Sequence, residues 1–113
     1  MTAEEFLKLK QAPFYKGNIV SDSMEPFLKI GSGIVVEVGI ENLKRFDLVV
    51  FYQNEKLICH YIWKLNKIVK PRMIQTRNLK GDFDLPIRDD LCLGKVVSHK
   101  LGFAQRLKLL LLK

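Results

Sequence analysis

The feature that most constrains the fold is a series of short runs rich in β-branched and aromatic residues, separated by glycines and other turn-forming residues. Such runs are typical of β-strands. We expect strands at residues 17–21, 33–38, 47–53, 56–63, 65–70, 72–76 and 94–98. Because 113 residues suffice for one hydrophobic core but not for two ordinary domains, residues 1–113 are expected to form a single domain. The predicted fold is mainly β, a small twisted antiparallel sheet or a partly open barrel.

Short helices are expected at both ends of the chain. Thr2 and Glu5 have the spacing of a capping box, which predicts a helix over residues 2–10 that ends before Pro13. The stretch FAQRLKLLLLK, residues 103–113, favours a short amphipathic helix that can lie on the protein or on a membrane surface. The chain has neither an apolar run of the ~18 residues that span a bilayer nor the features of an export signal. The expected location is cytoplasmic, with peripheral membrane contact through the C-terminal segment as a further option.

The clearest local element is the segment DLVVFYQNEKLICHYIW, residues 47–63. Two strand-like runs meet there at Asn54-Glu55, a two-residue connection suited to a tight hairpin. If Gln53 pairs with Lys56, then His60 lies opposite Val49. Both faces of the second run are largely apolar, so we expect that strand, which carries His60, to be central in the sheet.

The charge and the cysteines narrow the range of partners. Nineteen Lys and Arg against twelve Asp and Glu give a net charge of +7, which attracts phosphates on nucleic acids or on anionic membranes. The lysines are scattered without a dense run, so nucleic acid is not the expected partner. Cys59 and Cys92 fit no C-x-x-C pattern and lie in apolar stretches. We therefore expect no disulfide, no metal site and no cofactor.

The segment SDSMEPFLKIGSGIVVE, residues 21–37, contains a candidate nucleophile. Pro26 disfavours a helical conformation at Glu25, so the chain around Ser23 is expected to be bent. A serine hydroxyl needs a neighbouring base to act as a nucleophile at neutral pH. Of the two histidines, His60 is better placed on its predicted central strand, and His99 is expected at the surface.

A carboxylate beside the base would hold its tautomer and stabilise the imidazolium that forms. The polar segment LKGDFDLPIRDD, residues 79–90, supplies four candidates. They are Asp82, Asp84, Asp89 and Asp90. From the residues alone, a turn serine and a core histidine are the more ordinary interpretations of Ser23 and His60.

Four segments in order resemble a known set of sequence boxes. They are Ser-Met-Glu-Pro at residues 23–26, FLKIGSGIVVE at 27–37, LKRFDLVVFYQNEKLICHYI at 43–62 and LKGDFDLPIRDDLCLGKVV at 79–97. Together, over about residues 17–98, they resemble the type I signal peptidase and SOS-repressor autoprotease clan of serine peptidases. The resemblance implies Ser23 as nucleophile. It implies His60 as general base, as in the endoplasmic-reticulum and archaeal branch. The bacterial membrane enzymes and the repressors of the clan use a lysine at this place.

The resemblance also implies the acidic residues of the site. A Lys-Gly-Asp box of that branch corresponds to residues 80–82, which gives Asp82 an orienting role. A second aspartate follows a few residues later in the relatives, and here Asp84 ranks first, with Asp89 and Asp90 as competitors.

Substrate contacts follow from the same resemblance. The backbone N–H of Ser23, with the hydroxyl of Ser21, is expected to stabilise the oxyanion. Clan members bind an extended peptide beside the nucleophile by β-addition, which implies a substrate groove lined by Met24, Phe27 and Ile34.

Three functional hypotheses result. The first is a serine endopeptidase that cleaves a leader or precursor peptide after a small residue, through a Ser23 acyl-enzyme. The second is an inactive relative that binds a peptide or protein partner. It is motivated by departures from the family pattern at Gly31-Ser32, Phe46-Asp47 and His60-Tyr61, and by the lack of the family's transmembrane anchor. The third is a basic nucleic-acid-binding β module, motivated by the net charge of +7.

Overall fold

The computed structural model describes residues 1–111. In this part of the chain, seven strands form one antiparallel sheet in the order β1-β2-β7-β3-β4-β5-β6. The elements are α1 (Ala3–Leu9), β1 (Phe14–Asn18), β2 (Gly33–Val38), β3 (Leu48–Gln53), β4 (Lys56–Asn66), β5 (Met73–Arg77), β6 (Ile87–Arg88), a 3₁₀ helix (Asp89–Leu91), β7 (Cys92–Val96) and α2 (Phe103–Leu111). The sheet is twisted and does not close into a barrel, which confirms the predicted mainly β fold with short terminal helices.

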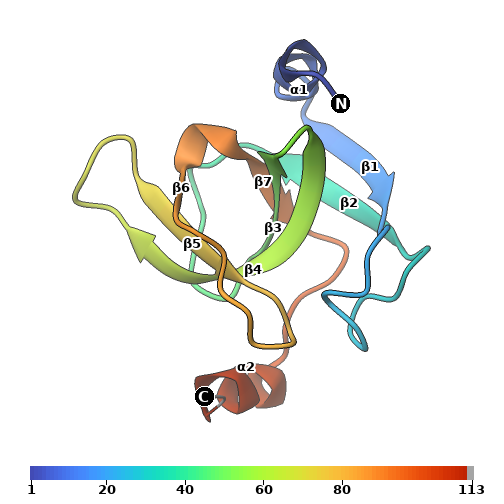
Figure 1. Ribbon diagram of the computed structural model, residues 1–113, viewed down its shortest axis with the longest axis vertical. Coiled ribbons are helices and arrows are strands. Elements are labelled where there is room, and N and C mark those ends of the chain that lie inside the picture. Colours follow the sequence, from blue (N-terminus) through green and yellow to red (C-terminus); the bar gives the residue numbers. More distant parts are fainter. Residues whose placement is uncertain (112–113) are drawn as a thin grey trace.

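The sheet curls so that β1 and β5 lie on opposite sides of β4, with α1 and α2 at opposite ends of the molecule (Figure 1). Alternate residues of β3 serve two hydrophobic clusters, because successive side chains of a strand point to opposite faces. Leu48 and Val50 belong to one cluster, and Val49 and Phe51 to the other. Both faces of the central strands are therefore covered, as the sequence predicted for the strand that carries His60.

The hairpin between β3 and β4 has the predicted register. Gln53 pairs with Lys56, and Val49 lies opposite His60. Asn54 and Glu55 have φ values of 52° and 62°. A two-residue hairpin turn whose twist matches the right-handed twist of its strands requires positive φ at both turn residues.

The first strand begins and ends earlier than predicted, at Phe14–Asn18 instead of 17–21. Its five residues pair with β2. At Ile19 the chain leaves the strand to close a loop, because the N–H of Ile19 donates to Ser32 O at 2.9 Å and its carbonyl accepts from Gly31 N at 2.8 Å.

The two strands predicted at 56–63 and 65–70 are one continuous strand, β4, of eleven residues. A shift in its register with β5 between Ile62 and Lys64 marks a bulge at Trp63. A bulge bends a strand without ending it, so the two predicted strands are parts of one. The last strand lies at Cys92–Val96 instead of 94–98, and the short strand β6 was not predicted.

The helices follow the sequence signals at both ends. In α1 the side chain of Thr2 accepts from Glu5 N, and the side chain of Glu5 accepts from Thr2 N, which is the predicted capping box. At the other end α2 spans Phe103–Leu111, and the last two residues of the predicted 103–113 helix lie outside the described residues. Among the described helices, none has the length and apolar character needed to cross a membrane.

Candidate active site

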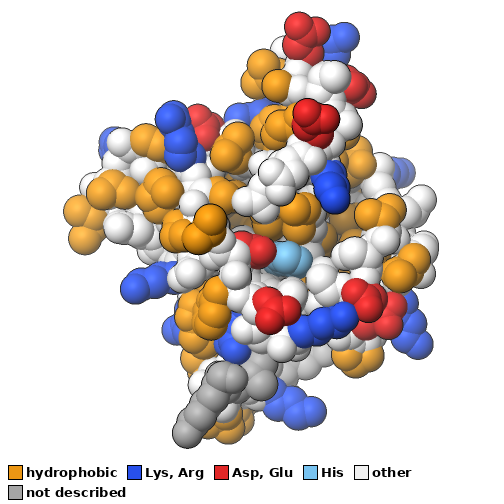
Figure 2. All heavy atoms as spheres, in the orientation of Figure 1, with side chains coloured by type: hydrophobic (Ala, Val, Ile, Leu, Met, Phe, Trp, Pro, Cys, Tyr) orange, Lys and Arg blue, Asp and Glu red, His pale blue; other side chains and the backbone are white. Residues whose placement is uncertain are grey.

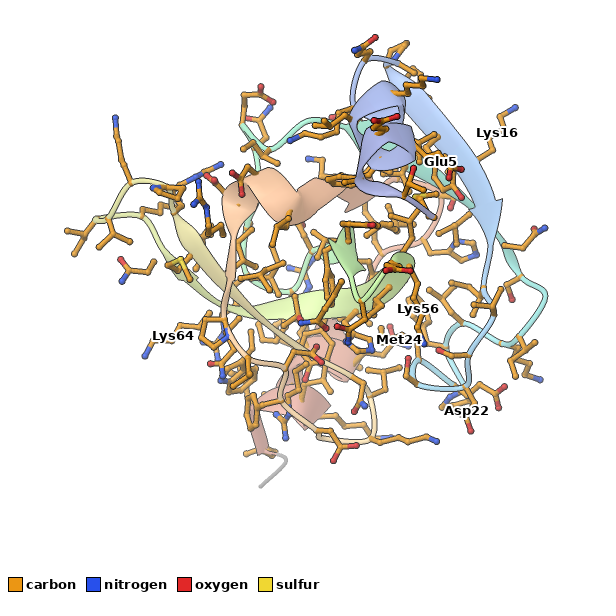
Figure 3. The ribbon with its side chains drawn as sticks, turned by 45° about the horizontal axis from the view of Figure 1, so that its top comes forward. Glu5, Lys16, Asp22, Met24, Lys56 and Lys64 are labelled. Carbon is orange, nitrogen blue, oxygen red and sulfur yellow. The ribbon has the colours of Figure 1, made fainter. Side chains whose placement is uncertain are left out.

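Ser23 lies in the loop that connects β1 to β2. The loop is closed at its base by the hydrogen bonds of Ile19, and its interior is held by Met24 and Leu28, each of which is 1% exposed. The carbonyl of Ser23 accepts from Leu79 N at 3.1 Å, which ties the loop to the segment after β5. Burial of these apolar side chains holds the backbone at Ser23 in place. Met24 points inward, while Asp22 points away from the molecule (Figure 3).

His60 reaches Ser23 from β4. The Nε2 atom of His60 lies 3.1 Å from Ser23 Oγ, within the range expected for a nucleophile and its base. The side chain is buried, with 7% of the residue exposed, and the ring of Phe51 packs edge-on against the imidazole with centroids 5.8 Å apart. The structure therefore brings together the two residues that the sequence predicted as nucleophile and base.

Asp84 holds the other side of the imidazole. His60 Nδ1 lies 2.5 Å from Asp84 Oδ2, and the hydroxyl of Thr76 on β5 donates to the same oxygen at 2.6 Å. Since an ionised carboxylate only accepts hydrogen bonds, Nδ1 carries the proton and Nε2 presents its lone pair to Ser23. Burial on its own would raise the pKa of Asp84, but the hydrogen bonds from His60 and Thr76 lower it below its ordinary value.

Asp82 does not contact His60, and the orienting role expected for it falls to Asp84. The Asp82 carboxylate accepts from Asn78 Nδ2 at 3.3 Å, and its N–H donates to Asn78 Oδ1 at 3.0 Å. These bonds close a turn around Gly81, whose φ is +96°. Asp84 comes after that turn, where its N–H donates to Thr76 O at 3.0 Å and places its carboxylate beside β5.

The other two acidic candidates form ion pairs elsewhere. Asp89 pairs with Arg72 at 3.0 Å, and Asp90 pairs with Arg88 at 3.0 Å. These contacts explain why neither aspartate competes with Asp84 for His60.

Ser21 lies beside Ser23. Its hydroxyl oxygen is 3.1 Å from Ser23 Oγ, on the exposed side of the loop. Among residues 1–111, no acceptor is hydrogen bonded to the backbone N–H of Ser23. Both groups predicted to stabilise an oxyanion thus adjoin the hydroxyl that would attack.

A groove of about 440 Å³ begins at the serine and histidine side chains. One wall is the segment from Tyr15 to Ser21, and the other is residues 56–60 of β4. Both walls present unpaired strand edges. Within the described residues, β1 pairs with β2 alone, and β4 pairs with β5 only from Tyr61 onward. Figure 2 looks onto a hollow with an imidazole at its base and acidic side chains beside it.

Two of the three predicted groove residues line this groove. Met24 and Ile34 do, whereas Phe27 lies behind the serine loop and lines a separate hollow of about 580 Å³ under α2. The prediction for Phe27 is wrong, because its side of the loop faces the hollow that it shares with α2 and not the groove.

Sequence reasoning missed Thr76, which is 1% exposed and donates to Asp84. A threonine in a predicted strand is unremarkable, so the sequence contains no signal for this role. Cys59, which lines the groove, and the buried Cys92 are free thiols. Burial raises the pKa of each to about 12. No three metal-binding side chains gather within the described residues.

In comparisons with known proteins, no family model, curated protein or solved structure matches this chain.

Proposed function

We propose that this protein is a serine endopeptidase of the signal-peptidase type, which cleaves a leader or precursor peptide through a Ser23 acyl-enzyme. The observation that carries the proposal is the continuous hydrogen-bonded chain from Ser23 Oγ through His60 to Asp84, at distances of 3.1 Å and 2.5 Å. This order of nucleophile, base and orienting carboxylate defines a Ser-His-Asp triad.

In the proposed reaction His60 Nε2 takes the proton of Ser23 as the hydroxyl oxygen attacks the scissile carbonyl. The N–H of Ser23 and the hydroxyl of Ser21 stabilise the oxyanion. His60, positively charged and stabilised by Asp84, gives the proton to the leaving amine. A water molecule, deprotonated by His60, then hydrolyses the acyl-enzyme and restores the serine.

The groove supports an extended peptide as substrate. The open edges of β1 and of residues 56–60 in β4 present backbone N–H and C=O groups to which such a peptide can add as a strand. The groove walls beside Met24 and Ile34 are apolar. Its volume of about 440 Å³ must hold both the backbone and the side chains of the bound peptide, which favours small residues near the cleaved bond. A cytoplasmic location stays a prediction, with which the free thiols of Cys59 and Cys92 agree.

The test is cleavage of a peptide library by the full chain, with products identified by mass spectrometry. We expect cleavage with a small residue before the scissile bond, and none above background with Ser23→Ala or His60→Ala. His99→Ala is the matched control, because His99 contacts Ser98 and lies outside the triad. No cleavage by the unmodified chain would refute the proposal. Peptide binding that is equal in Ser23→Ala, without turnover, would favour the inactive relative.

A further inference from the structure

The helix α2 presents an apolar face to solvent. Phe103, Leu107, Leu110 and Leu111 are 84%, 49%, 48% and 74% exposed. Their spacing places them on one side of the helix, since residues three, four and seven positions apart share a face. Leu109, which is only 6% exposed, lies on the opposite side and packs into the core. The side of α2 with more apolar residues is therefore the one that faces away from the protein.

Contacts on the inner side keep the helix in this orientation. The buried Arg77 donates from Nη1 to the carbonyl of Leu109 at 3.5 Å. Arg106 donates from Nε to the carbonyl of Leu101 at 3.0 Å. Rotation of α2 to bury its outer face would break both bonds and expose Leu109.

Basic residues border this outer face. At 100° per residue, Arg106 and Lys108 fall on the two sides of the position of Leu107. After Asp90 the sequence contains five Lys and Arg residues and no Asp or Glu. The positive charge of this segment complements a negatively charged surface, such as one of phosphates.

We propose that α2 binds the surface of an anionic phospholipid bilayer, with its axis in the plane of the membrane. The four apolar side chains enter the boundary between headgroups and acyl chains. Lys108 buries its apolar stem and reaches the phosphates with its charged end, while Arg106 stays bonded to Leu101 and adds positive charge beside the face. The triad takes no part in this contact.

The first test is sedimentation of the full chain with vesicles of phosphatidylcholine, with and without phosphatidylglycerol. We expect binding to the anionic vesicles that weakens with added salt, since each basic residue near such a surface contributes roughly a fivefold gain in affinity. Ser23→Ala should bind equally, which separates this proposal from the proposed peptidase activity. An absence of binding to anionic vesicles at low salt would overturn it.

The second test removes two outer leucines. The double variant Leu107→Ser, Leu110→Ser should stay folded with only a modest fall in melting temperature, because about half of each side chain is exposed, and should lose on the order of tenfold or more in vesicle affinity. Ile68→Ser is the matched control, since Ile68 is 94% exposed in the loop between β4 and β5. Equal binding by the double variant would overturn the proposal. So would a dimer of the unmodified chain that the double variant abolishes, because a second copy would then cover this face.

Discussion

Replacement of Asp84 by asparagine separates the two tasks of this carboxylate. In the native site, His60 Nδ1 and the Thr76 hydroxyl both donate to the same oxygen, Asp84 Oδ2. An asparagine that places its carbonyl oxygen there keeps both hydrogen bonds and the tautomer of His60. What it removes is the negative charge that stabilises the imidazolium.

The size of that loss follows from the geometry. Two unit charges about 4 Å apart interact by about 4 kcal/mol at an effective dielectric constant of about 20. The Asp84 side chain is 22% exposed, so solvent screens part of this energy. A remaining 2–4 kcal/mol, roughly, corresponds to a loss of about 30-fold to 1000-fold in kcat/KM.

The assay is steady-state cleavage of one peptide identified by the library experiment. Asp84→Asn should lower kcat/KM within the estimated range. Asp84→Ala should lower it further, because the Thr76 hydroxyl and His60 Nδ1 lose their shared acceptor. Asp82→Asn is the control and should leave kcat/KM unchanged, since Asp82 binds Asn78. Full activity of Asp84→Asn, or an equal loss in Asp82→Asn, would refute the assignment of Asp84.

Two further predictions concern pH and the thiols. The pKa of Asp84 is lowered by folding, so its contribution to stability is complete above the aspartate pKa of the unfolded chain and is lost as the pH falls through the lower pKa of the folded state. Urea unfolding between neutral and acid pH should therefore show a shallower loss of stability in Asp84→Asn than in the unmodified chain; parallel curves would contradict this. Burial raises the pKa of Cys59 and Cys92 to about 12, so neither thiol should react quickly with a disulfide reagent at mildly alkaline pH until urea unfolds the protein. A fast-reacting thiol in the folded state would show that one of them is not protected.

The parts of the structure that the sequence predicted correctly depend on local signals. The hairpin follows from a two-residue turn between alternating runs, and the capping box of Thr2 and Glu5 lies within one helical turn. The first strand and β4 were misplaced at their ends, where a loop-closing bond at Ile19 and a bulge at Trp63 decide the boundary. Such features depend on partners distant in sequence, and no short pattern reports them.

The candidate site also combines features that local sequence predicts with features that depend on contacts distant in sequence. Ser23 and His60 stand in recognisable segments, and their contact requires only that the predicted hairpin approach the serine loop. The choice between Asp82 and Asp84 depends instead on a turn around Gly81 that uses Asp82 for its own closure. The position of Phe27 depends on α2, which lies about 80 residues further along the sequence. Neither effect is visible in the composition or spacing of the local segment.

One edge of β4 pairs with β3, and its other edge pairs with β5 only from Tyr61 onward. This partial pairing explains why the groove lies next to the proposed triad. Residues 56–60 pair with β3 and leave their other edge open, whereas β5 begins to pair at Tyr61, directly after His60. An added peptide strand must therefore end its pairing with β4 beside His60, because β5 occupies the edge beyond it. The same β5 carries Thr76, which positions Asp84 on the far side of the imidazole. In the proposed peptidase, the point at which β5 joins β4 would therefore set both where a bound peptide stops and where His60 is oriented, so the sheet itself would select the bond presented to Ser23.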